Sequence, residues 1–349
     1  MLIIRPVEAK DLDDLYDLAI KAGTGLTTLP AHRDALQEKI DASAAAFAAE
    51  DGLEQKHTYF LVMEDLNTGK VVGTSAIIAG VGLDKPFYSY RLLHLTQVSH
   101  DPEMRVDTEM LQLSNDYVGA TEMATLFLDP DYRKGANGRF LAKARYLLIA
   151  AQSDRFTDMV ISEIRGWVDE QEQSPFWDAV GRHFFSMEFK EADEINGRGN
   201  SQFIADMMPK FPIYTALLPD SARAVIGKPH DSARAAIKLL EKEGFRFAGA
   251  VDIFDAGPAL EVHKNAIATT RSAFGGPLAG TVAGEGQAID HLVSNISLDS
   301  YRVVLTSVVD TNSGLWLPEA AAEALQVKAG DEILCAPLNP ESGRRREDA

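Results

Sequence analysis

The sequence predicts an α/β (α+β) protein with a three-layer fold around a central mixed sheet, followed by a small C-terminal β-barrel domain. Three observations support this prediction. The first 50 residues contain one apolar strand pattern and then two helical patterns. Two apolar segments follow, joined by the turn Asn67-Thr68-Gly69. From about residue 272 the chain becomes rich in glycine, and short strand patterns replace helical ones.

The N-terminal elements follow from apolar spacing. Residues 2–5 form a short apolar strand, and residues 9–22 place Leu12, Leu15, Leu18 and Ala19 on one face of a helix. A loop over residues 22–30 leads to an alanine-rich helix at about 32–49. Residues 58–64 and 71–79 are then expected to form antiparallel strands.

The next part of the chain continues the alternation of strands and helices. Residues 121–128 form a strand that Asp129-Pro130 stops, a helix runs from about 138 to 153, and residues 159–164 form a strand. Two helix-plus-strand units are alike: 174–181 with 184–189, and 232–243 with 245–253. Their likeness suggests a partial duplication within 158–255.

The glycine-rich stretch sets the expected domain boundary. Glycines at 275, 276, 280, 284 and 286 predict turns, and short strands follow at 302–308 and 332–337. We therefore expect one domain over 1–271 and a small β-barrel domain over 272–349.

Composition excludes several classes of function. The net charge of −18, from 34 basic and 52 acidic residues, argues against nucleic-acid binding, which needs a positive surface. Cys335 is the only cysteine, so no disulfide framework and no cysteine-based metal site is expected. No apolar run approaches a signal peptide or the roughly 18 residues of a membrane helix. We expect a cytoplasmic protein that binds neither membrane nor metal.

The segment after the 121–128 strand has the features of an anion site. Small residues between a strand and a helix start let backbone N–H groups converge on a phosphate, and the helix N-terminus adds positive potential. The segment contains the residues Arg133, Lys134, Gly135, Ala136, Asn137, Gly138 and Arg139. A P-loop would need Gly-Lys-Ser/Thr, which is absent, and a dinucleotide fold would place its glycines in the first strand-to-helix turn.

Arg133-Lys-Gly-Ala136-Asn-Gly138 resembles the R/Q-x-x-G/A-x-G/A motif of GNAT acyl-CoA N-acyltransferases. The resemblance implies that the backbone of Leu126 and Leu128, in a splayed strand, holds the pantetheine arm. Residues 239–245 are similar to the end of that superfamily's last helix. The position of the usual tyrosine acid is Leu240 here, so another group must protonate the thiolate.

Longer strings resemble the arginine N-succinyltransferase family over about residues 1–265. They are Gly-Leu-Thr-Thr-Leu-Pro (25–30), Ser-Pro-Phe-Trp (174–177), Phe-Ile-Ala-Asp-Met-Met-Pro-Lys-Phe-Pro-Ile-Tyr (203–214), Val-Ile-Gly-Lys-Pro-His (225–230) and Asp-Ile-Phe-Asp-Ala-Gly-Pro (252–258). The sequence departs from the family pattern at Pro229 and Ala136.

This resemblance implies an activity and a site. The family transfers succinyl from succinyl-CoA, a co-substrate, to the α-amine of L-arginine, by direct attack in a ternary complex and with no permanently bound cofactor. His230 is implied as the proton donor, a role that suits a side chain titrating near neutrality. The family also suggests a homodimer or a hetero-oligomer with a related subunit.

Other roles stay open at the level of sequence. Glu122 and Glu163, near the middle of the sheet, are candidate bases for the α-amine. The guanidinium could pair with Asp116, Asp169, Glu170 or Asp255, and the succinyl carboxylate with Arg91, Arg165, Arg182 or the Thr24–Thr28 loop. Alternatives are a GNAT enzyme acting on ornithine or another amine with a different acyl-CoA, and a non-catalytic subunit.

Overall fold

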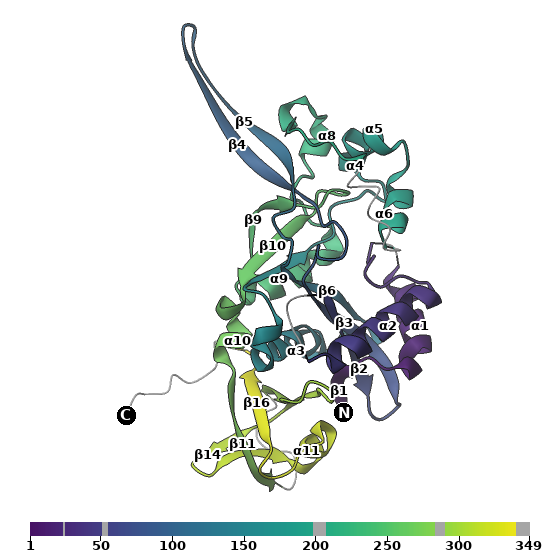
Figure 1. Cartoon of the computed structure of the whole chain (residues 1–349), viewed down its shortest axis with the longest axis vertical. Helices are drawn as coiled ribbons and strands as arrows, with labels where there is room; N and C mark the ends of the chain where they lie inside the picture. The colour runs from purple at the N-terminus through teal and green to yellow at the C-terminus, as the bar shows by residue number, and fades with distance from the viewer. Residues whose placement is uncertain (24, 51–54, 198–206, 283–289, 340–349) are drawn as a thin grey trace.

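A computed structural model describes residues 1–23, 25–50, 55–197, 207–282 and 290–339. Its strands join into one mixed sheet in the order β14-β15-β11-β16-β12-β13-β1-β2-β3-β6-β7-β10-β9-β4-β5-β8 (Figure 1). Within the described residues the neighbours pair antiparallel, except for the parallel pairs β6/β7 and β11/β15. The predicted α/β class with a mixed sheet is confirmed.

The strands and helices have the following bounds. The strands are β1 (Leu2–Pro6), β2 (His57–Asp65), β3 (Lys70–Ala79), β4 (Ser89–His100), β5 (Glu103–Ser114), β6 (Thr121–Leu128), β7 (Met159–Glu163), β8 (Ile213–Tyr214), β9 (Arg246–Val251), β10 (Pro258–His263), β11 (Phe274–Val282), β12 (His291–Asn295), β13 (Val303–Thr306), β14 (Val309–Thr311), β15 (Gly314–Pro318) and β16 (Glu332–Pro337). The helices are α1 (Leu12–Ala22), α2 (Arg33–Ala48), α3 (Asn137–Ala151), α4 (Pro175–Ala179), α5 (Gly181–Phe185), α6 (Phe189–Gly197), α8 (Asp220–Arg223), α9 (Arg234–Lys242), α10 (Ala268–Ser272) and α11 (Glu319–Leu325).

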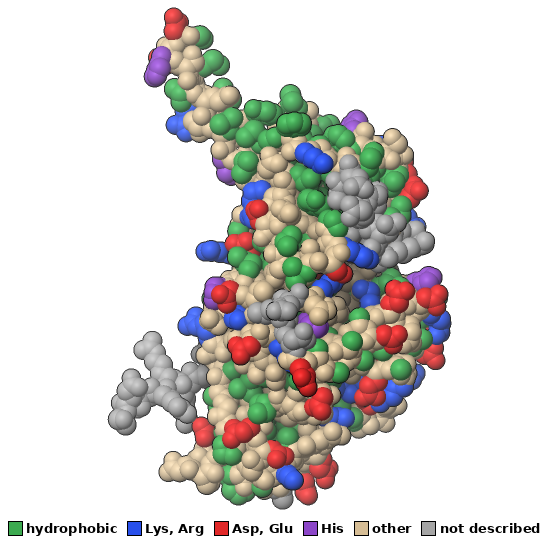
Figure 2. All heavy atoms as spheres, in the orientation of Figure 1, with side chains coloured by type: hydrophobic (Ala, Val, Ile, Leu, Met, Phe, Trp, Pro, Cys, Tyr) green, Lys and Arg blue, Asp and Glu red, His purple; other side chains and the backbone are tan. Residues whose placement is uncertain are grey.

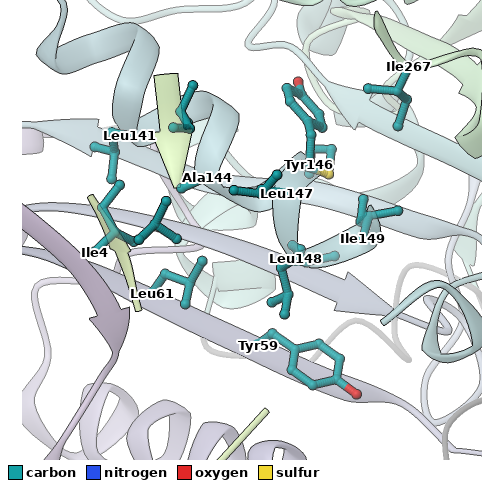
Figure 3. Close-up of a cluster of buried hydrophobic side chains, with 14 of the residues drawn as sticks. Ile4, Tyr59, Leu61, Leu141, Ala144, Tyr146, Leu147, Leu148, Ile149 and Ile267 are labelled. Carbon is teal, nitrogen blue, oxygen red and sulfur yellow. The ribbon is translucent and has the colours of Figure 1, made fainter. Parts of the chain in front are cut away.

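Strand β2 shows why the sheet is covered on both faces. Its five central residues are all buried, as expected for a strand with helices on either side. Phe60 and Val62 pack in a cluster with α1 and α2. The alternate residues Tyr59 and Leu61 pack with the long helix α3, as Figure 3 shows. Helices α1 and α2 on one face and α3 on the other therefore form the expected three layers.

The C-terminal strands continue the main sheet through the β13/β1 pair. Their pairs in the described residues give an open order from β14 to β1, so the closed barrel stays a prediction. The expected turn-rich stretch is wrong for its first part, because residues 274–282 form strand β11. Gly280 gives room to a neighbouring strand, since an added Cβ would lie 2.7 Å from the Trp316 ring. Gly284 and Gly286 lie outside the described residues.

The expected strand over residues 184–189 is also wrong. Helix α5 ends at Phe185 and α6 begins at Phe189. The Trp177 ring stacks on Phe185 and on Phe254, with ring centroids 5.4 and 5.6 Å apart. An added Cβ at Gly181 would lie 2.2 Å from the same ring. Packing around Trp177 thus overrides the strand propensity of this aromatic run.

A long hairpin of β4 and β5 was not assigned from the sequence. Each strand has 12 residues, and the hairpin projects far from the body of the molecule (Figure 1). Figure 2 shows apolar and charged side chains together along this arm. Val98 of β4 and Met104 of β5 are among its exposed residues. In the described part of the chain, no helix is both long and apolar enough to cross a bilayer.

Candidate active site

The site begins where two parallel strands part. Strands β6 and β7 pair at Thr121 with Val160 and at Glu122 with Ile161, and in the described residues β6 has no further pairing with β7. A register shift in the β3/β6 pair accompanies a positive φ of 56° at Thr125. The backbone of β6 around Leu126 therefore faces the gap between the two strands.

Side chains hold this divergence in place. Thr74 Oγ1 donates a 2.9 Å hydrogen bond to the carbonyl of Thr125, and the buried Arg145 donates a 3.2 Å bond to the carbonyl of Ala124. From β7, Ser162 Oγ donates a 3.2 Å bond to the carbonyl of Met123. Three successive carbonyls that lead up to and include the kink residue are thus occupied, and the kink is a fixed feature of the strand.

The predicted phosphate loop lies between β6 and α3. Gly135 has a φ of +57°, a conformation that favours glycine, and α3 starts at Asn137. The first-turn N–H groups of Gly138 and Arg139 have no carbonyl four residues back within the helix, so they can bind an anion.

The loop's side chains have separate contacts. Arg133 Nε donates to the carbonyl of Leu128 at 2.9 Å, which ties the loop to the end of β6. Asn137 Nδ2 donates to the carbonyl of Tyr132 at 3.0 Å, and Arg139 Nη1 donates to Asn339 Oδ1 at 2.6 Å. Lys134 Nζ lies 5.6 Å from the centre of the Tyr132 ring.

His230 caps a short 3-10 turn (Asp231–Ala233) before α9. The backbone N–H of Ser232 donates to its Nδ1 at 3.2 Å, and Ser232 Oγ lies 2.7 Å from the same atom. Because Nδ1 accepts a hydrogen bond from an N–H, the neutral ring carries its proton on Nε2. The half-buried side chain can therefore present its Nε2–H as a hydrogen-bond donor.

Arg165, one of the three arginines considered for the succinyl carboxylate, is joined to His230 through the backbone. The N–H of His230 donates to the Arg165 carbonyl at 2.9 Å. The Arg165 guanidinium lies against Gly25, where an added Cβ would be 2.3 Å from Nε, and it forms an ion pair with Glu172. Thr24 lies outside the described residues. Arg91 instead forms an ion pair with Asp116, and Arg182 forms an ion pair with Asp178 at the surface.

A pocket of about 210 Å³ contains both predicted bases. The sheet register explains this, because Ile78, Glu122 and Ile161 are direct neighbours on β3, β6 and β7. Glu163 lies two residues beyond Ile161 and therefore points to the same face. The pocket is lined by Lys56, Ile78, Val81, Gly82, Asp84, Lys85, Pro86, Phe87, Tyr88, Glu122, Glu163, Asp252, Ile253 and Phe254.

Burial changes the ionisation of these carboxyl groups. Glu122 is only 8% exposed, and this burial raises its pKa to about 7, against the opposing charges of Lys56 and Lys39. Burial also raises the pKa of Glu163 well above its usual range, and the nearby carboxylates Asp252 and Glu122 add to the effect. The pocket therefore contains a group that can accept a proton near neutral pH.

The four acids considered for the guanidinium are used elsewhere or lie outside the pocket lining. Asp116 pairs with Arg91, and Asp169 accepts the N–H groups of Gln171 and Gln173. Asp255 accepts from Gly166 and Gly257 at 2.7 and 2.8 Å, and Glu170 is exposed. Sequence reasoning missed Asp252, although it begins the string 252–258 directly after β9.

Family models match most of the chain. The model described as arginine N-succinyltransferase beta subunit matches residues 2–269, and the model for that subunit's C-terminal domain matches residues 277–337.

Individual proteins are similar over nearly the full length. An arginine N-succinyltransferase from Enterobacter sp. is 42% identical over 98% of this chain and 99% of its own, and one from Yersinia pestis is 42% identical over 99% and 100%. The structure of arginine/ornithine succinyltransferase subunit AI from Pseudomonas aeruginosa superposes with a TM-score of 0.87 at 33% identity, covering 97% of this chain and 99% of that one.

Proposed function

The chain belongs to the arginine N-succinyltransferase family, and we propose that it transfers a succinyl group from succinyl-CoA to the α-amine of L-arginine. The observation that carries this proposal is Glu122, a buried carboxylate with a pKa of about 7 at the point where β6 and β7 stop pairing. In a GNAT-type fold, this gap takes the pantetheine arm along Leu126 and Leu128. The phosphate loop at 133–139 takes the pyrophosphate.

The reaction needs one base and one acid. Glu122 removes a proton from the α-ammonium, directly or through a water. The neutral amine attacks the thioester carbon, so a C–N bond forms and the C–S bond breaks. Protonated His230 gives its Nε2 proton to the departing CoA thiolate and becomes neutral, while the attacking nitrogen loses its second proton to solvent as the amide forms. Ser232 Oγ, 2.7 Å from Nδ1, can accept the proton that stays on Nδ1.

Arg165 is the best-supported partner for the succinyl carboxylate. Its guanidinium lies against Gly25 in the 25–30 segment, and its carbonyl accepts from His230. An arginine fork binds a carboxylate through two parallel hydrogen bonds, which a neutral acyl group cannot accept. Glu172, the present partner of Arg165, is a carboxylate that succinyl would replace.

A thiol-release assay tests the function. Purified protein is combined with succinyl-CoA or acetyl-CoA and with L-arginine or L-ornithine. We expect the fastest CoA release with succinyl-CoA and arginine. Absence of release with every pair would refute an enzymatic role, whereas release with acetyl-CoA alone would refute succinyl transfer.

Ornithine is a second acceptor that one observation favours. The structural relative from Pseudomonas aeruginosa is named an arginine/ornithine succinyltransferase subunit. The same assay ranks the two amines by kcat/KM.

The organisation of the molecule is part of the proposal. We infer a catalytic unit over 1–271 and a smaller β-rich unit over 272–349. A homodimer or a hetero-oligomer with a related subunit is supported by the projecting β4–β5 arm, because an isolated hairpin is only marginally stable in water. Light scattering of the purified chain measures its assembly.

A further inference from the structure

The pocket beneath Glu122 has two kinds of lining that match one type of ligand. Ile78, Phe87, Tyr88 and Phe254 supply apolar and aromatic surface. The charged lining contains Lys56, Lys85 and four carboxyl groups, of which Asp84 is paired with Lys56; the other three, Glu122, Glu163 and Asp252, come from three separate segments of the fold. A ligand with an aliphatic stem and a cationic end would bury its stem against the apolar side chains and place its charge beside the carboxylates.

Two of the carboxylates lack partners within the protein. Glu122 is 8% exposed, yet among the described residues it accepts no hydrogen bond and joins no ion pair. Glu163 likewise has none in that part of the chain. A buried carboxylate without a hydrogen-bond partner is costly, so the retention of Glu122 at the pocket, beside the half-buried Glu163, indicates that a ligand supplies the missing donors.

The third carboxylate is held in a fixed orientation. The N–H groups of Phe254 and Asp255 donate to Asp252 Oδ1 at 2.7 and 2.9 Å. These bonds anchor the carboxylate in the loop between β9 and β10, with Asp252 in the pocket lining. A preset acceptor costs little ordering entropy when a ligand binds.

The strand register shows which end of the pocket lies far from β6, the strand proposed to hold the pantetheine arm. Glu122 is on β6 itself, while Glu163 is on β7 opposite Ala259 of β10. The loop with Asp252 lies beyond, between β9 and β10. One part of the pocket therefore extends from Glu122 across β7, whereas Ile78 of β3 lines the pocket on the other side of β6.

We propose that Glu163 and Asp252 form the subsite for the guanidinium group of the amine substrate, while Glu122 faces its α-amine. This assignment rests on the proposed function. A guanidinium is planar, weakly hydrated and rich in donors, so two carboxylates from different segments can bind its edges while aromatic walls contact its faces. An ammonium on a shorter side chain would reach fewer of these groups.

The test separates binding of the guanidinium from base catalysis. In Glu163→Gln and in Asp252→Asn, whose side-chain oxygen can still accept the two backbone N–H groups, we expect KM for L-arginine to rise roughly 30-fold or more, because one partner of a buried charged pair is lost. The value of kcat at saturating arginine should change less than about fivefold, as should KM for succinyl-CoA. Asp116→Asn, at a surface carboxylate paired with Arg91, is the control and should keep wild-type KM.

Calorimetric titration gives a readout that does not depend on turnover. Wild-type protein should bind L-arginine more tightly than L-citrulline, its neutral analogue of similar length, and both variants should lose most of that difference. If Glu163→Gln lowers kcat but leaves KM and arginine affinity unchanged, Glu163 is a base and the assignment is wrong. If wild-type protein binds arginine selectively but releases no CoA, the proposed function fails while the subsite stands. Equal affinity of wild-type protein for the two amino acids overturns the subsite.

Discussion

The backbone N–H of His230 donates a 2.9 Å hydrogen bond to the carbonyl oxygen of Arg165. A second bond, from the N–H of Trp167 to the carbonyl of Lys228, runs alongside it, and Gly166 forms an isolated bridge with Pro229. The proposed proton donor and the proposed acyl-carboxylate partner are thus on two segments joined at the backbone. Their relative positions are set by main-chain hydrogen bonds rather than by flexible side chains.

Replacing His230 tests the proton donor. We expect His230→Ala to lower kcat by roughly 10²-fold or more, because the thiolate then leaves without a general acid. Binding of CoA, followed by titration calorimetry, should stay near the wild-type value. His263→Ala, at an exposed histidine that caps a different turn, is a matched control. Near-wild-type turnover in His230→Ala would exclude the ring from the mechanism.

Glu122 predicts a pH dependence. A base whose pKa is about 7 must lose its proton to act, so kcat/KM for arginine should fall about tenfold per unit as pH drops below about 7. Glu122→Gln should remove this acidic limb and slow the reaction at pH 8. If the acidic limb persists unchanged in Glu122→Gln, the base is another group, and Glu163 is the first to test.

The same residue predicts a change in stability. Its pKa rises from an ordinary 4.5 to about 7 on folding, so the folded state holds the proton more tightly. The stability that this provides is complete below pH 4.5 and is lost as pH rises through 7. In thermal melts, the melting temperature of Glu122→Gln minus that of wild type should therefore be larger at pH 8 than at pH 4.5. The opposite trend would mean that Glu122 is ionised in the folded protein throughout this range.

The sequence predicted best those elements whose signal is local. Strand β6 and strand β16 have the predicted bounds, because Asp129-Pro130 stops the first and a turn with Gly330 precedes the second. The β4–β5 hairpin was missed because much of its length is exposed, and it lacks the apolar alternation of a strand on a core.

Some residues of the candidate site were proposed from the sequence, but their arrangement was not. Glu122 and Glu163 were selected for their places near the middle of the sheet, and they do line one pocket. Asp252 joins them only through the order β7-β10-β9, which brings together segments about 90 residues apart in sequence. Asp255, one of four acids considered for the guanidinium, accepts the N–H groups of Gly166 and Gly257, whose backbones pass too close for any side chain.

The proposed contact of Arg165 with the succinyl carboxylate predicts that this residue discriminates between acyl donors. Arg165→Met should raise KM for succinyl-CoA by roughly 10- to 100-fold, the effect of losing a hydrogen-bonded charge partner. Turnover of acetyl-CoA should be unaffected, since it has no distal carboxylate. Arg182→Met, at an arginine paired with surface acids, is the control. Equal losses with both acyl donors would show that Arg165 supports the fold of the site rather than the succinyl group.

A buried ion pair behind the site predicts a large stability change. Lys143 of α3 donates to Glu243, which follows α9, and their side chains are 8% and 1% exposed. Glu243 also accepts the N–H and the hydroxyl of Thr269, at 2.8 and 2.9 Å. Glu243→Ala would leave the Lys143 charge buried without its partner, so we expect a loss of about 3–5 kcal/mol in the free energy of unfolding, measured with urea. The double replacement of Lys143 and Glu243 by Met should recover much of this loss, because it removes the uncompensated charge as well. A loss under about 1 kcal/mol in Glu243→Ala would indicate that water reaches Lys143 and that α3 and α9 are joined mainly by apolar packing.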